Sequence, residues 1–266
     1  MILVINVGNN EMIVAVFDSE EVIASWRMTT SAVKTSDEIG STIMRFFDFD
    51  DIDAANIEDV VISSVVPNVM YSLTNAVKKY FRMEPIIIDS SMFSGIDLSR
   101  MKNPKELGNN RLVNISAAYE LYGGPVMVVD YATCTTYDLV DDKGVFLTGI
   151  TAPGITVCTE SLFVKAAQLP RIEIKKPDSI YCQDIISCIQ GGIYYGHRGE
   201  IKYIIDSIKK ETGFEKITVV ATGGLAKVID NDGDIFDIID PFLSFKGLRL
   251  LYEKNKKLRE GRECSL

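Results

Sequence analysis

The chain of 266 residues has few of the residues that build metal centres and disulfide frameworks. It contains one histidine, His197, and five cysteines, an odd number that includes no CxxC pair. Structural zinc sites and disulfide-stapled folds use such residues in pairs or at short spacing. We therefore expect neither, and we interpret Cys134, which has no histidine near it in the sequence, as a small spacer and not a nucleophile.

Basic residues are also scarce, because 28 Lys and Arg stand against 37 Asp and Glu, a formal net charge of −9. A negative charge opposes nonspecific attraction to nucleic-acid phosphates, so no nucleic-acid partner is expected. The apolar run at the amino terminus has no basic leader and is far shorter than a signal core or a membrane span. We expect a cytoplasmic protein without membrane association.

Two segments share one pattern: ILVINVGNNEMIVAVFD at 2–18 and VMVVDYATCTTYDLV at 126–140. In each, a buried strand ends at an Asx residue, Asn6 or Asp130, and small or hydroxyl-bearing residues lead directly into a second strand. Such turns let backbone amides approach an anion. Either turn alone is equally compatible with an ordinary β-hairpin, but the pair predicts a duplicated phosphate-binding fold.

The remaining chain alternates strands and helices, which predicts an α/β protein with a mixed sheet in each half. Thr35 and Glu38 have the spacing of a capping box ahead of a helix. We place the domain boundary near residue 118, giving domains 1–117 and 118–266. Strands are expected at 20–28, 59–67, 84–89, 144–150 and 216–222, and a loop at 90–108. Helices are expected at 69–81, from about 110 to 122, at 156–168, at 184–212 with glycines at 191, 192 and 196 that could interrupt it, and at 241–258 with a frayed basic tail.

A third polar turn, Thr222–Gly224, follows the apolar strand at 216–222 and leads into a helix start, where glycines let a ligand come close to the backbone. By itself it is a simple strand-to-helix turn. Three polar turns at the ends of buried strands in a duplicated fold indicate a ribonuclease H-like, two-domain phosphotransferase of the actin, hexokinase and Hsp70 type. Its nucleotide cleft would lie between the domains.

The order of the short motifs resembles that of the type III pantothenate kinases over nearly the whole chain. The resemblance is carried by N-x-GNN at 6–10, SSVVP at 63–67, NPKELGNNR at 103–111, AAYELYGGP at 117–125, DYATCTTYD at 130–138, APG at 152–154, LF at 162–163, LP at 169–170, ATGGLA at 221–226 and GLRLLYE at 247–253. It implies ATP-dependent phosphorylation of pantothenate to 4'-phosphopantothenate, the first step of coenzyme A biosynthesis, by a homodimer.

The resemblance also implies roles for individual residues. ATP phosphates and Mg²⁺ would be held by the first two turns, with a monovalent cation, K⁺ or NH₄⁺, near Asp130, and pantothenate would meet Arg111, whose planar fork suits a carboxylate. The implied phosphate-binding residues are Asn6, Gly8, Asn9, Asn10, Thr133, Thr135 and Thr136. The implied adenosine-binding residues are Thr222, Gly223 and Gly224, and the implied substrate-binding residues are Gly108, Arg111, Met101 and Ile185.

The chain departs from the family pattern where the chemistry should be. The family reads D-x-GNT in the first turn and G-A-D-R before the substrate arginine, and this chain has Asn6 and Asn110 in place of the two aspartates. Asn110 occupies the position of the family's general base, and an amide cannot take up a proton as a carboxylate does. Losing a general base lowers the rate by about 10²–10⁴, or roughly 3–5 kcal/mol of barrier.

Milder departures affect metal binding and the substrate pocket. Asn6 brings no charge to a magnesium ion, and Ala132 adds a methyl group where the family has glycine. Met101 and Ile185 replace a tyrosine and a threonine of the family. The expected function is thus a weakened pantothenate kinase, with two alternatives: a non-catalytic paralogue with a binding or regulatory role, and a kinase for another small hydroxyl compound.

Overall fold

The computed structural model describes residues 1–89, 92, 94–166 and 168–263. The chain divides into two compact units, and each is built on one five-stranded sheet. The first unit consists of Met1–Ile96, Lys102–Ala117 and the segment from Leu243 onward, and the second of Asp97–Met101 and Ala118–Phe242. This division differs from two continuous domains at 1–117 and 118–266, because the last helix packs with the first sheet.

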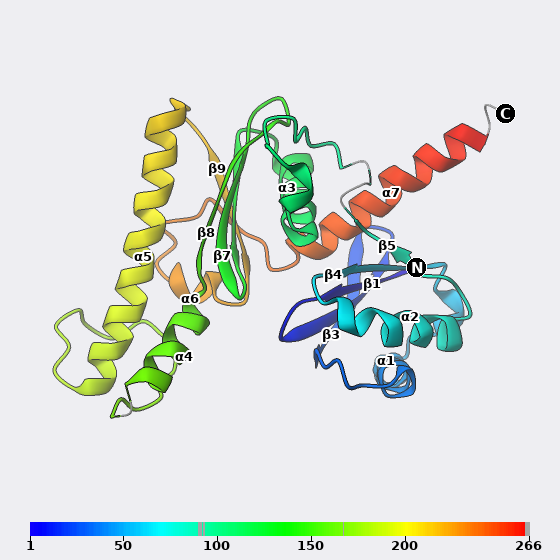
Figure 1. Cartoon of the computed structure of the whole chain (residues 1–266), viewed down its shortest axis with the longest axis horizontal. Helices are drawn as coiled ribbons and strands as arrows, with labels where there is room; N and C mark the ends of the chain where they lie inside the picture. The colour runs from blue at the N-terminus through cyan, green and yellow to red at the C-terminus, as the bar shows by residue number, and fades with distance from the viewer. Residues whose placement is uncertain (90–91, 93, 167, 264–266) are drawn as a thin grey trace. The chain divides into compact units, whose positions relative to one another are not determined.

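The first unit contains a mixed sheet in the order β3-β2-β1-β4-β5 (Figure 1). Its strands are β1 (Ile2–Val7), β2 (Glu11–Asp18), β3 (Glu21–Thr29), β4 (Asp59–Ser64) and β5 (Ile86–Ile87). β1 is antiparallel to β2 and parallel to β4. β4 and β5 are shorter than expected, and β4 ends before Pro67, which begins the next helix at its first turn, where a missing N–H costs nothing.

The second unit repeats this arrangement in the order β10-β9-β6-β7-β8. Its strands are β6 (Val126–Tyr131), β7 (Cys134–Val140), β8 (Phe146–Pro153), β9 (Thr218–Gly223) and β10 (Ile238–Ile239). β6 is antiparallel to β7 and parallel to β9, as β1 is to β2 and β4. The two sheets therefore have the same topology, which confirms the predicted duplication within an α/β fold.

Helices cover both faces of the first sheet. α1 (Ser36–Phe49) and α2 (Pro67–Phe81) pack together against one face (Figure 1), where a core includes Leu3, Ile5, Ile43 and Leu73. α3 (Asn109–Tyr122) and α7 (Leu243–Glu263) supply Val113, Phe245, Leu248 and Leu251 to the core on the other face. The predicted capping box is confirmed, since the N–H of Glu38 donates to Thr35 Oγ1 and the N–H of Thr35 donates to the Glu38 carboxylate.

In the second unit one face of the sheet packs against α4 (Ile155–Lys165), α5 (Ile185–Thr212) and the short α6 (Ala226–Ile229). The possible break in α5 at its glycines is wrong, because the helix runs uninterrupted over 28 residues. Gly191 serves close packing there, since a Cβ on it would lie 2.9 Å from the Sγ of Cys182.

The predicted frayed tail is wrong for the part of the basic stretch that the structure describes. α7 continues to Glu263, and Lys256 donates hydrogen bonds to the carboxylate of Asp59 (3.3 Å) and to the hydroxyl of Tyr252 (2.8 Å). These contacts join the middle of α7 to the first strand residue of β4. No helix among the described residues has the length and apolar character needed to cross a membrane.

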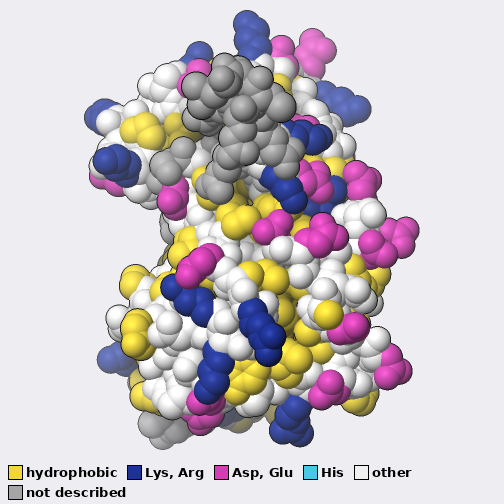
Figure 2. All heavy atoms as spheres, turned by 90° about the vertical axis from the view of Figure 1, so that its right-hand side faces the viewer, with side chains coloured by type: hydrophobic (Ala, Val, Ile, Leu, Met, Phe, Trp, Pro, Cys, Tyr) yellow, Lys and Arg dark blue, Asp and Glu magenta, His cyan; other side chains and the backbone are white. Residues whose placement is uncertain are grey.

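Charged side chains of both signs are distributed over the face drawn in Figure 2. On this face (Figure 2), Lys and Arg side chains lie among acidic, apolar and neutral polar ones and do not form one continuous basic surface.

Candidate active site

The first polar turn connects β1 to β2 and is fixed by backbone and side-chain hydrogen bonds. The N–H of Gly8 donates to the carbonyl of Glu11 (2.9 Å), and the hydroxyl of Thr30 donates to the carbonyl of Gly8 (2.8 Å). A Cβ on Gly8 would lie 3.2 Å from the carbonyl oxygen of Glu11, closer than ordinary contacts allow. Glycine therefore suits this position, and the turn presents the exposed residues Asn9 and Asn10.

Asn6 and Asn110 both lie next to Ser63, a residue for which the sequence predicts no role. Asn6 in β1 pairs in register with Ser63 in β4, so both side chains point to the same side of the sheet. The hydroxyl of Ser63, which is fully buried, donates to Oδ1 of Asn110 at 3.2 Å. The buried Oδ1 of Asn6 has no hydrogen-bond partner among the described residues. An unpaired buried acceptor beside this pair points to a ligand that supplies a donor or a cation.

Gly108, Asn110 and Arg111 lie at the start of α3. The N–H of Leu112 donates to the carbonyl of Gly108 (3.1 Å), and the side-chain amide of Asn109 donates to the carbonyl of Ile88 (3.3 Å). These bonds attach the first turn of the helix to the segment after β5. Arg111 is half-buried there, directly after the residue that Ser63 contacts.

The second polar turn, between β6 and β7, is built against the start of α4. The N–H of Ala132 donates to the carbonyl of Cys134, and the N–H of Gly154 donates to the carbonyl of Thr133, each at 3.1 Å. A Cβ on Gly154 would lie 2.4 Å from the carbonyl oxygen of Thr133. The glycine of the APG motif thus lets β8 approach the turn, and Thr133 remains exposed at its tip.

Polar side chains share one face of the second sheet next to this turn. Asp130 lies opposite Thr136 on β7 and beside Thr222 on β9. Oγ1 of Thr136 is buried and has no hydrogen-bond partner among the described residues. Asp138 lies in the middle of β7 opposite Val128, is 1% exposed and shares the face of Thr136. Two carboxylates and two hydroxyls therefore converge on this face.

The glycine pair after β9 contains one position that requires glycine. Gly223 pairs with Tyr131 of β6 and has a φ of +91°, which side chains rarely adopt. A Cβ there would lie 2.3 Å from the carbonyl oxygen of Tyr131, whereas a Cβ on Gly224 would meet nothing within 4 Å. The main chain of Gly223 therefore lies directly against β6, beside Tyr131, which is the residue after Asp130.

The opposite face of the second sheet carries two tyrosines that stay protonated and therefore cannot accept a proton. Burial raises the pKa of the Tyr131 hydroxyl and of the Tyr137 hydroxyl, and Tyr137 also donates to the carboxylate of Glu200 at 3.0 Å. The hydroxyl of Tyr131 and that of Thr135 are buried without a hydrogen-bond partner among the described residues. Thr135, expected to bind phosphate, thus faces away from Asp130 and Thr136.

The predicted site residues fall into three groups. In the first unit Asn6 and Asn110 are brought together by Ser63, and Gly8–Asn10, Gly108 and Arg111 adjoin them in the chain. In the second unit Asp130, Thr136 and Thr222 share a face, with Thr133 and Gly223 at its edge. Met101 ends the short segment Asp97–Met101, and Ile185 is the first residue of α5, 53% exposed, where the side chain of Asp184 caps the helix.

Sequence reasoning missed Ser63 and Asp138 as members of these groups. The signal for Ser63 was a hydroxyl at the carboxyl end of a buried strand, the place where Asn6 and Asp130 also lie. The signal for Asp138 was its spacing of two from Thr136, which puts both on one side of a strand.

Comparison with known proteins assigns the family. A sequence model of the type III pantothenate kinases matches residues 2–207. A type III pantothenate kinase of Agathobacter rectalis is 45% identical over 257 residues, which cover 97% of this chain and 98% of the relative.

Solved structures support the fold alone, because their sequences are distant. The activator of the 2-hydroxyisocaproyl-CoA dehydratase of Clostridium difficile is 11% identical, with a TM-score of 0.53 and coverage of 97% of each chain. The ethanolamine utilization protein EutJ of Carboxydothermus hydrogenoformans is 14% identical, with a TM-score of 0.50, coverage of 94% of this chain and 89% of that protein. Both agree with the duplicated two-domain α/β fold described above. The motifs in register on the two sheets, the family match and the 45% identity together show that this chain belongs to the type III pantothenate kinase family.

Proposed function

We propose that this protein phosphorylates the hydroxyl of pantothenate with ATP, as its family does, at a rate lowered by Asn6 and Asn110. The observation that carries the proposal is the position of Asn110. Its amide oxygen accepts a hydrogen bond from the buried hydroxyl of Ser63, which pairs in register with Asn6, and these contacts support an ordered polar site at this position. Phosphoryl transfer depends mainly on positioning and electrostatics, so a site without its base still supports turnover.

ATP would be bound by the residues whose places in the two sheets correspond. The turns Gly8–Asn10 and Ala132–Thr133 offer small residues and backbone N–H groups to phosphates, and the unpaired hydroxyl of Thr136 offers a donor. The backbone at Thr222–Gly224 would lie against adenosine, where only glycine at 223 permits the observed φ and the close approach to Tyr131. Thr135 would support the turn from its other face.

Pantothenate would be oriented by the start of α3. Arg111 follows Asn110 directly, so a carboxylate bound by its guanidinium places the rest of the substrate beside Asn110. Gly108, with nothing within 4 Å of a Cβ built on it, leaves room there. Met101 and Ile185 would give an apolar lining to the pocket, in place of the tyrosine and threonine hydroxyls of the family.

The chain's own residues fit a hard cation next to ATP. Among the described residues no group of three or more His, Cys, Asp and Glu could hold a metal ion alone. Magnesium in kinases is commonly held by one or two carboxylates together with substrate phosphates and water, and Asp130 and Asp138 share one face. When bound, Mg²⁺ would neutralise charge on the ATP phosphates. Asp130 is also the proposed neighbour of a monovalent cation, K⁺ or NH₄⁺.

The proposed assembly is a homodimer. Large apolar side chains are exposed on α4 and around the start of α5: Val157, Leu162, Val164, Ile180, Tyr181, Ile185 and Ile186. Exposed apolar residues gathered in one region of the fold are typical of a protein interface. Sedimentation equilibrium tests this proposal, and a monomer at micromolar concentration would contradict it, as would a dimer that is unaffected by Val164→Asp and Tyr181→Asp.

The direct test of the function mixes purified protein with ATP, Mg²⁺, K⁺ and pantothenate and measures 4'-phosphopantothenate by mass spectrometry. We expect slow formation above a control without enzyme. The Asn6→Asp/Asn110→Asp variant should form it much faster, because both carboxylates return to an intact site. No product from either protein would contradict the proposal.

Two other functions are favoured by specific residues. The departures at Asn6 and Asn110 favour a non-catalytic paralogue that keeps nucleotide binding, and the apolar Met101 and Ile185 favour a kinase for another small hydroxyl compound. Activity only in the double variant indicates the paralogue. A thermal shift with ATP, none with pantothenate, and no activity in either protein indicate the changed substrate.

A further inference from the structure

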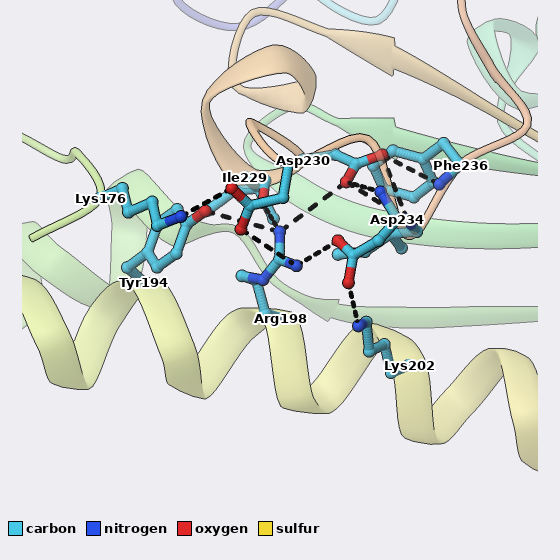
Figure 3. Close-up of polar contacts among 10 residues, drawn as sticks. Lys176, Tyr194, Arg198, Lys202, Ile229, Asp230, Asp234 and Phe236 are labelled. Carbon is cyan, nitrogen blue, oxygen red and sulfur yellow. Dashed lines mark hydrogen bonds and ion pairs between the residues drawn. The ribbon is translucent and has the colours of Figure 1, made fainter. Parts of the chain in front are cut away.

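A buried arginine on α5 holds the loop that follows the third polar turn (Figure 3). The guanidinium of Arg198, with its side chain 10% exposed, donates to the carbonyl of Ile229 at 2.5 Å and to the carboxylate of Asp234. It also lies 5.5 Å from the ring centre of Tyr194, one helical turn earlier on α5. Ile229 is the last residue of α6, so Arg198 fixes the carboxyl end of that helix.

The loop from Asp230 to Phe236 closes on its own first residue. The Asp230 carboxylate accepts the backbone N–H groups of Asp234 (2.9 Å), Ile235 (3.2 Å) and Phe236 (3.0 Å). Its side chain is 1% exposed and lies 3.8 Å from the Arg198 guanidinium. The loop is therefore a closed turn with a buried negative charge that needs a nearby positive charge.

Two lysines complete the charge balance at the rim of the loop. Lys202 donates to the carboxylate of Asp234 at 2.5 Å, and Lys176 donates to that of Asp232 at 2.6 Å. Both lysines are more exposed than Arg198, and exposed ion pairs contribute little free energy. Three acids thus face three cations, and the buried members of the two sets are Asp230 and Arg198.

The same loop is tied to the strand that carries the adenosine-binding turn. The N–H of Asp237 donates to the carbonyl of Val219 (3.0 Å), and the N–H of Val219 donates to the carboxylate of Asp237 (2.8 Å). Val219 lies on β9, which ends at Gly223, and α6 begins at Ala226. The turn at 222–225 therefore connects the end of β9, which pairs with β6, to α6, which Arg198 attaches to α5.

We propose that Arg198 is a positioning residue that sets the Thr222–Gly224 turn for nucleotide binding, through the carboxyl end of α6. This rests on the proposed function, which assigns adenosine to that turn. Stability alone is a poor explanation for a buried arginine, since well-packed apolar residues stabilise equally well or better, whereas a fork of donors fixes a carbonyl and a carboxylate at set places.

The test is the affinity of the full-length protein for Mg²⁺-ATP, measured by titration calorimetry, which does not need turnover. Arg198→Met should raise the Kd by roughly tenfold, the cost of one charge-assisted hydrogen bond, and Arg198→Lys should recover part of the loss. In the Asn110→Asp background, the KM for ATP should rise while the KM for pantothenate and kcat change less than about twofold. Asp206→Asn, an exposed carboxylate on the same helix, is the control and should change none of these.

Asp234→Asn keeps the proposal testable if Arg198→Met does not fold, because Asp234 is 45% exposed and its loss leaves the contact of Arg198 with Ile229. A Kd about threefold higher supports the proposal. An unchanged Kd in Asp234→Asn and in a folded Arg198→Met overturns it, even if both melt at lower temperature. Wild-type protein that binds ATP but forms no phosphopantothenate overturns the proposed function alone, and protein that binds no ATP overturns both.

Discussion

The hydroxyl of Ser63 donates a hydrogen bond to the side-chain oxygen of Asn110 across 3.2 Å, although 47 residues separate them in the chain. A buried donor aimed at this oxygen suits a carboxylate better than an amide, because hydrogen bonds to a charged acceptor are the stronger ones. An aspartate at position 110 would therefore find this donor already in place.

Asn110→Asp should therefore raise kcat/KM for pantothenate by about 10²–10⁴, the usual contribution of a general base. Steady-state kinetics at saturating ATP measure this, with Asn109→Asp as the matched control, since Asn109 uses its amide to donate to Ile88. An equal gain in the control would show that added charge, and not the position at 110, is responsible.

In the Asn110→Asp background, Ser63→Ala should move the acidic limb of the pH–rate profile to higher pH. The lost hydrogen bond had favoured the charged carboxylate, so its removal raises the pKa of the introduced group. A profile of kcat/KM between pH 4 and pH 8 would show the shift. An unmoved limb would mean that the introduced carboxylate does not accept the serine hydroxyl.

Thr136→Val should weaken ATP binding without destabilising the fold. The hydroxyl of Thr136 is buried and has no partner among the described residues, so an isosteric methyl group removes an unpaired polar group, a change that is neutral or favourable. Calorimetric ATP binding and urea unfolding measure the two effects. Thr159→Val is the control, because that hydroxyl donates to Ile155 at 2.7 Å, and it should lose about 1 kcal/mol of stability with ATP affinity unchanged.

Gly223→Ala should lower the free energy of unfolding by about 1–3 kcal/mol and reduce ATP affinity. The added methyl group is strained by the φ of +91° and meets the carbonyl of Tyr131. Gly224→Ala, one residue later and in open space, should be nearly neutral in stability. Thermal unfolding of both variants distinguishes the two positions, and similar losses in both would refute this account of the turn.

The single histidine predicts a pH dependence of stability. Burial lowers the pKa of His197 below its ordinary 6.5, although Glu200 opposes this shift. The unfolded chain then binds the proton more tightly, so this contribution to stability is complete above pH 6.5 and is lost as pH falls from there through the folded pKa. Urea unfolding between pH 5 and pH 8 should show the decline, and His197→Gln should reduce it. A His197 ring resonance that titrates at or above 6.5 in the folded protein would contradict this.

Local features were predictable from sequence, and features that depend on distant pairing were not. The hairpins at 2–18 and 126–140 follow from alternating residues and tight turns, which are encoded within a few positions. The grouping of Asn6, Ser63 and Asn110 depends on the register of β1 with β4 and on the docking of α3. No spacing within a single segment reveals either.

The same limit explains the helices. Glycine at 191 has a low intrinsic preference for helix, but here it lies close to the side chain of Cys182, and this contact is known only from packing. The amphipathic pattern of α7 predicted a helix correctly but could not say which sheet it covers. Tertiary contacts, such as that of Tyr252 with Asp59, decide this.

The loop from Asp230 to Asp234 has acidic side chains at alternate positions, as do loops that enclose a divalent cation. Here the positive charge that balances these acids comes from side chains of the protein itself, chiefly the buried Arg198. The shape of the loop is therefore established once, when the chain folds, and does not follow the concentration of free calcium or magnesium around the protein. A chelator that stops phosphoryl transfer would leave this part of the molecule in place.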